Sequence, residues 1–446
     1  MSKIKKILIL GGGFGGIKVL KLVQNRFKNY PNIRISLVSQ DNYFLYTPML
    51  PQVSSGLIHP NDITIPIRKL CKQAEFYHAT ISYINFDQKL VTITREFDGK
   101  VRALEYDYLV ISLGGSTNFF KNKNLEKHAF AIKTVEDAIS IYSQVINMLE
   151  NAAQTSDVEF KKELMTFTVV GGGFAGVETI GEINQLVRDS VKNFYPSIGM
   201  ENINMNLISS KELILPELGP KLGKMAGEYL KKVGVNVITK TKAIDAGEDF
   251  VKLDNGKIIP CMTLIWAAGI DLDPVIKELE CKHHKSGKLK VDKYLRVRDH
   301  DDVFALGDCA FVTNPITGES YPATAQNTIH QSLTVANNLF SLIMGKSKFQ
   351  EFSFKSKGIM TTLGRKVAIA VIFGFHIKGP IAWLIWRTYY LSKLPLLEKK
   401  FQVATSWMAD LLFKRDLTFI GLIKNKYLTK VDIKSDHPSI KDFFKD

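Results

Sequence analysis

The chain has 446 residues and is 45% hydrophobic, which suits two or three packed domains and excludes an intrinsically disordered protein. Its 59 Lys and Arg outnumber its 44 Asp and Glu, and the net charge of +15 favours an anionic partner such as dinucleotide phosphates, nucleic acid or an acidic lipid surface. Four widely spaced cysteines and the lack of a stretch of about 20 apolar residues argue against a zinc site, a redox-active disulfide and a membrane-spanning helix.

A glycine-rich turn lies between an expected strand and an expected helix near the N-terminus. The apolar run 7–10 is followed by Gly11-Gly12-Gly13-Phe14-Gly15-Gly16, by a helix-compatible segment and by a second strand candidate over 33–38. In G-x-G-x-x-G the first glycine permits a tight turn, the second lets backbone approach a pyrophosphate, and the third lets helix and strand pack closely. The helix N-terminus then offers free N–H groups to the phosphates. This segment therefore predicts a dinucleotide-binding βαβ unit.

The same pattern returns in the middle of the chain. The run 167–170 precedes Gly171-Gly172-Gly173-Phe174-Ala175-Gly176, and a helix-compatible segment and a second strand candidate over 203–208 follow. One such motif is a weak signal, but two copies, each inside a strand–turn–helix–strand unit, predict an α/β protein with two Rossmann-like domains. In each half a further buried strand ends in small residues, at Gly114 and at Ala268 and Gly269, where the chain would cross close to a bound dinucleotide.

With these motifs the chain resembles the two-dinucleotide-binding-domain flavoproteins of the pyridine nucleotide-disulphide oxidoreductase superfamily. The resemblance is greatest to the type II, non-proton-pumping NADH:quinone oxidoreductases and runs from about Lys5 to Arg415. It implies FAD in the first unit, NADH or NADPH in the second, and no metal. It also implies an enzyme that passes a hydride from NAD(P)H to FAD and two electrons on to a membrane quinone.

Three further segments carry this resemblance. The segment 303–310 resembles the second FAD motif of the family, whose Asp is Asp308 here, and 42–50 resembles the loop that covers the flavin. Glu178 would lie near the meeting point of flavin and nicotinamide. The FAD contacts implied are Gly11, Gly13, Phe14, Gly15, Gly16, Ser39, Tyr46, Thr47, Gly114, Asp308 and Gln326. The NAD(P)H contacts implied are Gly171, Gly173, Phe174, Ala175, Gly176, Glu178, Ser209, Lys211, Ala268 and Gly269.

The segment 322–331 resembles the A-Q-x-A-x-Q quinone motif of the family, with two departures. Ala325 and Gln326 match, whereas Thr328 replaces the second Ala and His330 the second Gln, with Gln331 next to it. Gln326, His330 and Gln331 are the implied quinone contacts, and Glu178, Gln326 and His330 are the candidate catalytic residues. His330, with an ordinary pKa of about 6.5, could supply a proton to the quinone. The alternative is an ordinary helix residue.

The choice of nicotinamide depends on the end of the second strand of each unit. An acidic residue there usually holds the adenosine ribose hydroxyls and rejects a 2′-phosphate. Ser209 takes this position in the second unit and Ser39 takes it in the first. Because a hydroxyl does not repel a phosphate and Lys211 could meet one as a point charge, we expect NADPH to be accepted at least comparably to NADH. The alternative is that Glu212 reaches back and favours NADH.

The C-terminal region contains an expected amphipathic helix over 401–414. Apolar residues gather on one face and polar residues on the other, and a preceding segment, 381–394, places Trp and Tyr beside Arg387 and Lys393. The apolar face consists of Phe401, Ala404, Met408, Leu411 and Leu412. Such a pattern alone more often marks a core helix, but type II enzymes carry a membrane-surface segment in this position. We therefore expect a helix that lies on the membrane, followed by a polar tail over Asp432–Asp446.

The expected organisation is an FAD domain from residues 1–118 and 286–350, an NAD(P)H domain over 119–285 between them, and a C-terminal membrane-association module over 351–446. The partners expected are a membrane quinone and a lipid bilayer surface, with no nucleic acid and with allowance for a homodimer. The location expected is the cytoplasmic face of the cell membrane, as a peripheral protein. Two alternatives stay open: a soluble NAD(P)H:acceptor reductase, and a redox-sensing flavoprotein of the apoptosis-inducing-factor type.

Overall fold

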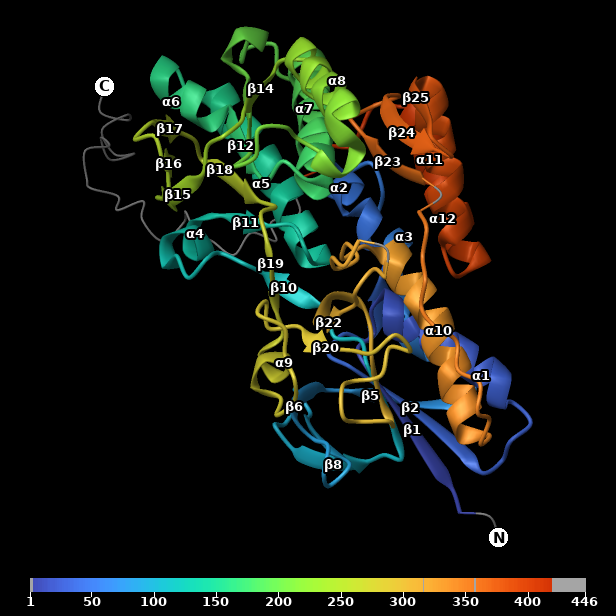
Figure 1. Ribbon diagram of the computed structural model, residues 1–446. Helices are drawn as coiled ribbons and strands as arrows, with labels where there is room; N and C mark the ends of the chain where they lie inside the picture. Colours follow the sequence, from blue (N-terminus) through green and yellow to red (C-terminus); the bar gives the residue numbers. More distant parts are fainter. Residues whose placement is uncertain (1–2, 316, 357, 419–446) are drawn as a thin grey trace, which may run out of the picture.

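The computed structural model describes residues 3–315, 317–356 and 358–418. Two five-stranded parallel sheets form the centres of two α/β domains, one above the other in Figure 1, and a C-terminal module lies along one flank. The expectation of two Rossmann-like units is confirmed.

The lower domain in Figure 1 is built on a sheet in the order β21-β9-β1-β2-β5. Its strands are β1 (Lys5–Leu10), β2 (Ile33–Ser39), β5 (Ala74–His78), β9 (Tyr108–Ile111) and β21 (Val303–Ala305). The central strands are continuous apolar runs, as expected for parallel strands that are covered on both faces. Helices α1 (Phe14–Phe27) and α10 (Ala325–Ile343) pack against each other on this domain. The domain is therefore assembled from the first and the returning segments of the chain.

The upper domain repeats this design with a sheet in the order β11-β18-β12-β13-β14. Its strands are β11 (Phe130–Ala131), β12 (Thr166–Val170), β13 (Asn204–Ile208), β14 (Val235–Ile238) and β18 (Thr263–Trp266). Its long helices are α5 (Val135–Gln154), α7 (Phe174–Phe194) and α8 (Gly219–Lys232). As in the first unit, the glycine-rich turn connects the central strand β12 to the helix that follows it.

The chain passes between the two domains along a pair of antiparallel strands, β10 (Gly115–Thr117) and β19 (Ile270–Leu272). This pairing places the outward and the return crossing side by side, and the exact domain boundaries expected at residues 118 and 285 stay predictions. The indole Nε1 of Trp266 donates a hydrogen bond to the Asn118 carbonyl oxygen at 2.9 Å, which ties β18 to the outgoing segment.

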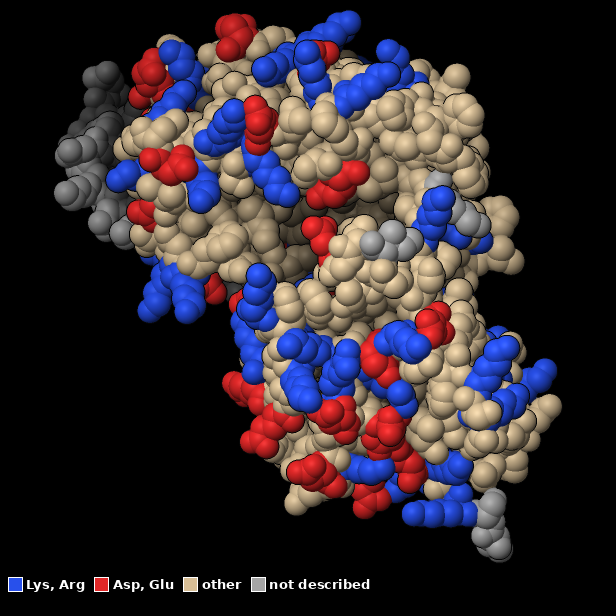
Figure 2. Space-filling model, viewed as in Figure 1, with Lys and Arg blue, Asp and Glu red and all other residues tan. Residues whose placement is uncertain are grey.

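The C-terminal module contains a three-stranded antiparallel sheet and two helices. Its elements are β23 (Gly358–Thr362), β24 (Ala368–Ile372), β25 (Phe375–Gly379), α11 (Pro380–Lys393) and α12 (Leu397–Leu412). The sequence analysis expected the second helix, over 401–414, but neither the first helix nor the strands. In the space-filling view the surface over this module is largely uncharged (Figure 2). No helix in the described ranges is long and apolar enough to cross a membrane. The tail expected over Asp432–Asp446 lies outside them.

Shorter elements complete the two domains. The first domain adds β3 (Tyr43–Leu45), α2 (Leu50–Val53), α3 (Pro60–Ile63), β4 (Thr64–Pro66), β6 (Thr80–Asn85), β7 (Leu90–Thr94), β8 (Val101–Glu105), α9 (Pro274–Glu278), β20 (Leu289–Lys290) and β22 (Ala310–Phe311). The second adds α4 (Lys123–His128), α6 (Val158–Leu164), β15 (Ala243–Ala246), β16 (Phe250–Leu253) and β17 (Ile258–Pro260). Helix α2 contacts both α5 and α7, so the first domain also reaches the second away from the crossing strands.

Candidate dinucleotide sites and the surrounding polar network

The first glycine turn leaves open space at the N-terminus of α1. Gly13 is the N-cap residue, no side chain caps the helix, and the first turn carries no acidic residue. A Cβ added to Gly13 would meet no atom within 4 Å, whereas one added to Gly16 would lie 1.8 Å from the Gly11 carbonyl oxygen. The first N–H groups of the helix have no intrahelical partner. The turn therefore fits a pyrophosphate above Gly13 and a close strand–helix contact at Gly16.

The second glycine turn has the same geometry. Gly173 is the N-cap of α7, again without a side-chain cap or an acidic residue in the first turn. A Cβ at Gly173 would meet nothing within 4 Å, and one at Gly176 would lie 1.9 Å from the Gly171 carbonyl oxygen. The chain thus presents two turns of the form that suits a dinucleotide pyrophosphate.

The two turns differ in how they are covered. At the first, Gly15 is buried, and an added Cβ would lie 2.1 Å from Ser112 Oγ and 2.9 Å from Thr328 Cγ2 of α10. At the second, the matching residue Ala175 is exposed to solvent. Helix α10 thus packs against the first turn at Gly15, whereas the second turn is exposed at Ala175. This difference suits a tightly held cofactor at the first turn and an exchanging substrate at the second.

Helix α10 also fixes the loop that carries Asp308. Gln331 is 3% exposed, and its Oε1 accepts a hydrogen bond from the Gly307 N–H at 2.8 Å. Asp308 follows at the carboxyl end of β21, half-buried, and Gly114, after β9, faces open space. Gln331 thus holds the loop that carries Asp308, and its expected contact with a quinone stays a prediction. The Asp308 loop and the Gly114 turn lie at the same sheet edge as the first glycine turn.

Gln326 and His330 lie one helical turn apart on α10, and both are half-buried. The His330 ring packs against Phe354, with ring centroids 4.6 Å apart. The roles of Gln326 and His330 toward a quinone stay predictions.

The expected flavin-covering loop connects the first domain to the C-terminal module. Tyr46 is 2% exposed, lies 5.7 Å from Phe14 between ring centroids, and donates its hydroxyl hydrogen to the Tyr390 carbonyl oxygen at 3.1 Å. Burial raises the pKa of Tyr46 above its ordinary range, so the hydroxyl stays a donor. Thr47, half-buried, begins the next short helix. This loop is therefore held by α11 as well as by its own domain.

Glu178, on the second turn of α7, is buried against β23. Its Oε1 accepts hydrogen bonds from the Thr361 hydroxyl at 2.9 Å and from the Thr362 N–H at 3.1 Å. Burial raises its pKa to about 7, and the nearby Glu182 acts in the same direction, while the two hydrogen bonds oppose the shift. A carboxyl group with this pKa exists in both protonation states at neutral pH.

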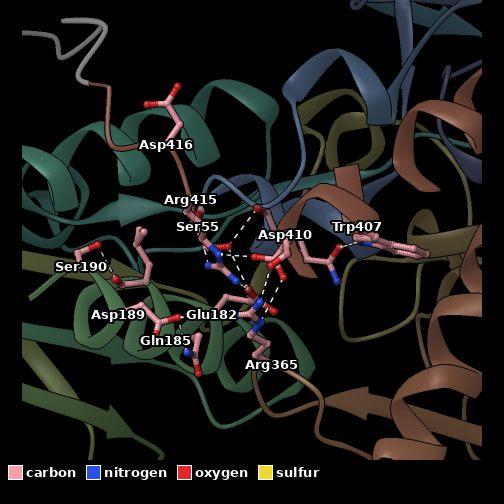
Figure 3. A network of polar contacts seen from close by, with 12 residues as sticks. Ser55, Glu182, Gln185, Asp189, Ser190, Arg365, Trp407, Asp410, Arg415 and Asp416 are labelled. Atoms are coloured by element: carbon pink, nitrogen blue, oxygen red, sulfur yellow. Dashed lines mark hydrogen bonds and ion pairs between the residues drawn. The ribbon is translucent and has the colours of Figure 1, made fainter. Parts of the chain in front are cut away.

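The sequence analysis did not identify Glu182 or the charged groups around it. Glu182 is 3% exposed, and its Oε2 accepts from the Ser55 hydroxyl at 3.0 Å and from Arg415 Nη2 at 3.3 Å. Arg415 Nε in turn donates to Asp410 Oδ1 at 3.1 Å (Figure 3). Burial raises the pKa of Glu182 and Arg415 opposes that shift. The i, i+4 spacing of Glu178 and Glu182 on an otherwise buried helix face was the signal available in the sequence.

The end of β13 shows how the second site could distinguish nicotinamides. Ser209 is 4% exposed beneath the turn, with its Oγ 2.4 Å from where a Cβ of Gly172 would lie. Ser39 has the same relation to Gly12 in the first unit. Glu212 does not reach Ser209 but forms an exposed ion pair with Lys240 at 2.8 Å. Lys211 is exposed, and its backbone N–H donates to Ser209 Oγ at 3.3 Å.

After β18, Trp266 donates to the Ala268 carbonyl oxygen at 2.8 Å, and Gly269 adopts a φ of +89° just before β19.

Helix α12 turns its apolar face outward. Phe401 and Leu412 are each 72% exposed, whereas Val403, Trp407 and the charged Asp410 are buried against the protein. The exposed apolar surface consists of Phe373, Phe375, Ile381, Leu384, Leu397, Phe401, Met408, Leu411, Leu412 and Phe413. The structure thus exposes most of the apolar face that the sequence analysis expected, and the role of this helix at a membrane stays a prediction.

Arg387, one of the two basic residues noted in the segment 381–394, is buried between α11 and α12 and does not extend into solvent. It is 7% exposed, and its guanidinium carbon lies 3.8 Å from the Trp383 ring centroid and 4.7 Å from that of Trp407. This stacking between α11 and α12 replaces the snorkelling of a long basic side chain.

Known proteins similar to this chain agree with the two-site geometry. The model of the pyridine nucleotide-disulphide oxidoreductase family matches residues 5–332. A probable NADH dehydrogenase of Dictyostelium discoideum is 31% identical over 421 residues, covering 93% of this chain and 91% of that protein. A type II NADH:quinone oxidoreductase of Mycobacterium tuberculosis is 27% identical over 421 residues, covering 92% and 89%.

Among solved structures, NDH2 from Plasmodium falciparum in complex with NADH has a TM-score of 0.86 at 22% identity, covering 93% of this chain and 100% of that one. This structural similarity supports the fold, and the family model and the sequence relatives show that the chain is homologous to these proteins. The chain belongs to the pyridine nucleotide-disulphide oxidoreductase family, among the relatives of the type II NADH dehydrogenases.

Proposed function

We propose that the protein is an FAD-dependent NAD(P)H:quinone oxidoreductase without proton pumping. The observation that carries this proposal is the pair of uncapped glycine turns, one packed against α10 at Gly15 and one exposed at Ala175. A bound FAD would accept a hydride from a nicotinamide and deliver two electrons to an acceptor. The chain holds the dinucleotides through the turns at Gly13 and Gly173, and Asp308 and Gly114 lie where the flavin end would bind.

A membrane quinone is the acceptor that we assign. The named relatives include NADH:quinone and NADH-ubiquinone oxidoreductases, and the outward apolar face of α11 and α12 suits the surface of a bilayer. Gln326 and His330, both half-buried on α10, are the residues that we assign to the quinone. The protein would then be peripheral, on the cytoplasmic face of the cell membrane. An exposed face of this kind speaks against the soluble reductase.

For the nicotinamide substrate we propose that NADPH is accepted at least comparably to NADH. Ser209 brings no negative charge beneath the turn, and Glu212 is paired with Lys240. Lys240 thus neutralises Glu212, and the exposed Lys211 adds a positive charge next to Ser209 in the sequence. Two of the relatives are named as NAD(P)H-ubiquinone oxidoreductases.

The test is stopped-flow mixing of the purified, FAD-loaded protein with NADH or NADPH, with and without a short-chain quinone. We expect rapid loss of the flavin absorbance with either nucleotide and its quinone-dependent return over many turnovers. Flavin reduction that persists with quinone present would move the function to another acceptor or to redox sensing. No reduction by either nucleotide would contradict the assignment of the second site.

A further inference from the structure

A buried charged cluster connects helix α7 of the upper domain to the segment that follows α12 (Figure 3). Arg415 makes three contacts: Nη2 to Glu182 Oε2 at 3.3 Å, Nε to Asp410 Oδ1 at 3.1 Å, and Nη1 to the Ser55 carbonyl oxygen at 3.3 Å. The side chains of Arg415, Glu182 and Asp410 are 8%, 3% and 4% exposed. Such a cluster is costly to bury unless each charge has a partner.

Glu182 lies one helical turn from Glu178, and both carboxyl groups belong to the buried face of α7. The charged and titratable groups that face Glu182 are Glu178, Arg415, Asp410 and Arg387, and α2 adds the hydroxyl of Ser55. The two carboxyl groups are therefore buried on one face of α7, and the guanidinium group of Arg415 contacts Glu182.

Around Glu178 the facing titratable groups are Glu182 and Tyr390 of α11. Its hydrogen-bond donors are neutral, the Thr361 hydroxyl and the Thr362 N–H from β23. Two carboxylates in one poorly solvated pocket do not both ionise readily, and the one beside a guanidinium keeps its charge more easily. This asymmetry decides which of the two carboxyl groups holds a proton.

We propose that Arg415 is a positioning residue that holds Glu182 as a carboxylate against Ser55 and so leaves the proton of the Glu178–Glu182 pair on Glu178, an effect that the neighbouring Asp410 carboxylate weakens. Glu178 then presents a neutral carboxyl group on the second turn of the helix whose N-terminus receives the nicotinamide dinucleotide. The pair makes and breaks no bond in the substrate. The consequence for turnover rests on the proposed function, whereas the location of the proton does not.

The first measurement is an infrared titration of the full-length, FAD-loaded protein, following the carbonyl band of protonated carboxyl groups. In the wild type we expect a band with a midpoint near pH 7 that disappears in Glu178→Gln and persists in Glu182→Gln. In Arg415→Gln the pair should hold its proton more tightly, and the midpoint should rise by about one unit or more. Arg415→Lys should give an intermediate shift, because an ammonium group keeps the positive charge but cannot make all three contacts of the guanidinium group.

Two further variants make the test specific. Lys414→Gln removes the same charge from the neighbouring, exposed residue and should leave the midpoint unchanged. Asp410→Asn removes a carboxylate from the cluster and should move the midpoint downward, opposite to Arg415→Gln. The Asp410→Asn variant also tests the proposal if the Arg415→Gln variant does not fold.

The second measurement is the pH profile of turnover with NADH and a short-chain quinone, whose midpoint should move in the same order across the variants. Because the infrared titration needs no quinone, a protein that fails to reduce quinones would still report where the proton lies. A band that survives Glu178→Gln and is lost in Glu182→Gln would overturn the proposal. Equal midpoints in the wild type, Arg415→Gln and Asp410→Asn would also overturn it.

Discussion

Ser209 shows how one side chain beneath a glycine turn can set the preference for a nicotinamide. Its Oγ lies against Gly172, so an acidic side chain here would face the adenosine ribose. We expect Ser209→Asp to lower kcat/KM for NADPH by about tenfold or more, which corresponds to about 1.4 kcal/mol of repulsion, and to change that for NADH much less. Steady-state kinetics with both nucleotides at a fixed quinone concentration measure the ratio.

Glu212→Gln is the matched control, because it removes a carboxylate that is already paired with the exposed Lys240. We expect the NADPH-to-NADH ratio to stay nearly constant in this variant. A large gain in NADPH use would show that Glu212, and not residue 209, is the acidic determinant.

Glu178 imposes a pH dependence on stability. Its pKa is about 7 in the folded chain against 4.5 for an ordinary Glu, so the folded state binds the extra proton between these values. Stability therefore falls as pH rises from about 4.5 to about 7, and the cost is fully present above that range. At about 1.4 kcal/mol per pKa unit the cost reaches about 3 kcal/mol.

We expect Glu178→Gln to remove this cost, because an amide oxygen can still accept from Thr361 and Thr362. The variant should be more stable than the wild type by up to about 3 kcal/mol at about pH 8, with the difference vanishing near about pH 4. Urea unfolding at the two pH values measures the difference. A gain of equal size at both would mean that packing, and not ionisation, is responsible.

At the scale of elements, we expect the N-terminus of α1 to bind FAD and the N-terminus of α7 to bind NAD(P)H. An added Cβ at Gly13 or Gly173 meets no protein atom, so Gly13→Ala and Gly173→Ala should fold normally and occupy only ligand space. We expect Gly13→Ala to lose FAD, seen as a lower ratio of flavin to protein absorbance. Gly173→Ala should keep FAD and raise KM for NAD(P)H severalfold.

Gly16→Ala is the structural control for these variants, since its Cβ would lie 1.8 Å from the Gly11 carbonyl oxygen. It should disrupt the turn itself and lower the melting temperature. If Gly13→Ala retained FAD and lost nicotinamide binding, the assignment of the two turns would be reversed.

Helix α12 shows what a periodic pattern leaves open. The spacing of Phe401, Met408 and Leu412 predicts an amphipathic helix, but it does not say whether the apolar face points inward. In the structure the inner face combines the apolar Val403 and Trp407 with polar contacts: Ser406 donates to Asp62 Oδ2 at 2.9 Å, and Trp407 Nε1 donates to Gln52 Oε1 at 2.9 Å. The orientation follows from polar partners on α2 and α3, which lie far away in the sequence.

For the whole molecule, this orientation places an apolar surface on the flank of both domains. We expect Phe401→Asp combined with Leu412→Asp to abolish pelleting with lipid vesicles while leaving the flavin content and the melting temperature unchanged, because both side chains are 72% exposed. Phe97→Asp, at a site that is 94% exposed on the β7–β8 hairpin, is the control and should still pellet. Unchanged pelleting of the double variant would contradict membrane docking through this face.

The sequence by itself determined the two dinucleotide turns and the two-domain α/β fold. These depend on local features, since a glycine turn, the strand before it and the helix after it lie within a few dozen residues and repeat at Gly11 and Gly171. It also predicted the two serines under the turns, because each has a fixed position in a motif. The amphipathic helix was predicted from the period of its apolar residues.

Only the tertiary structure decided which polar groups meet. Gln331 binds Gly307, Tyr46 binds the backbone of Tyr390, and Glu182 binds Ser55 and Arg415. Most of these partners are separated by a hundred residues or more, and no period or motif in the sequence encodes such pairs. Their choice depends on which buried polar group lacks a partner once the two domains and the C-terminal module have packed, because an unpaired buried charge or hydrogen-bonding group is costly.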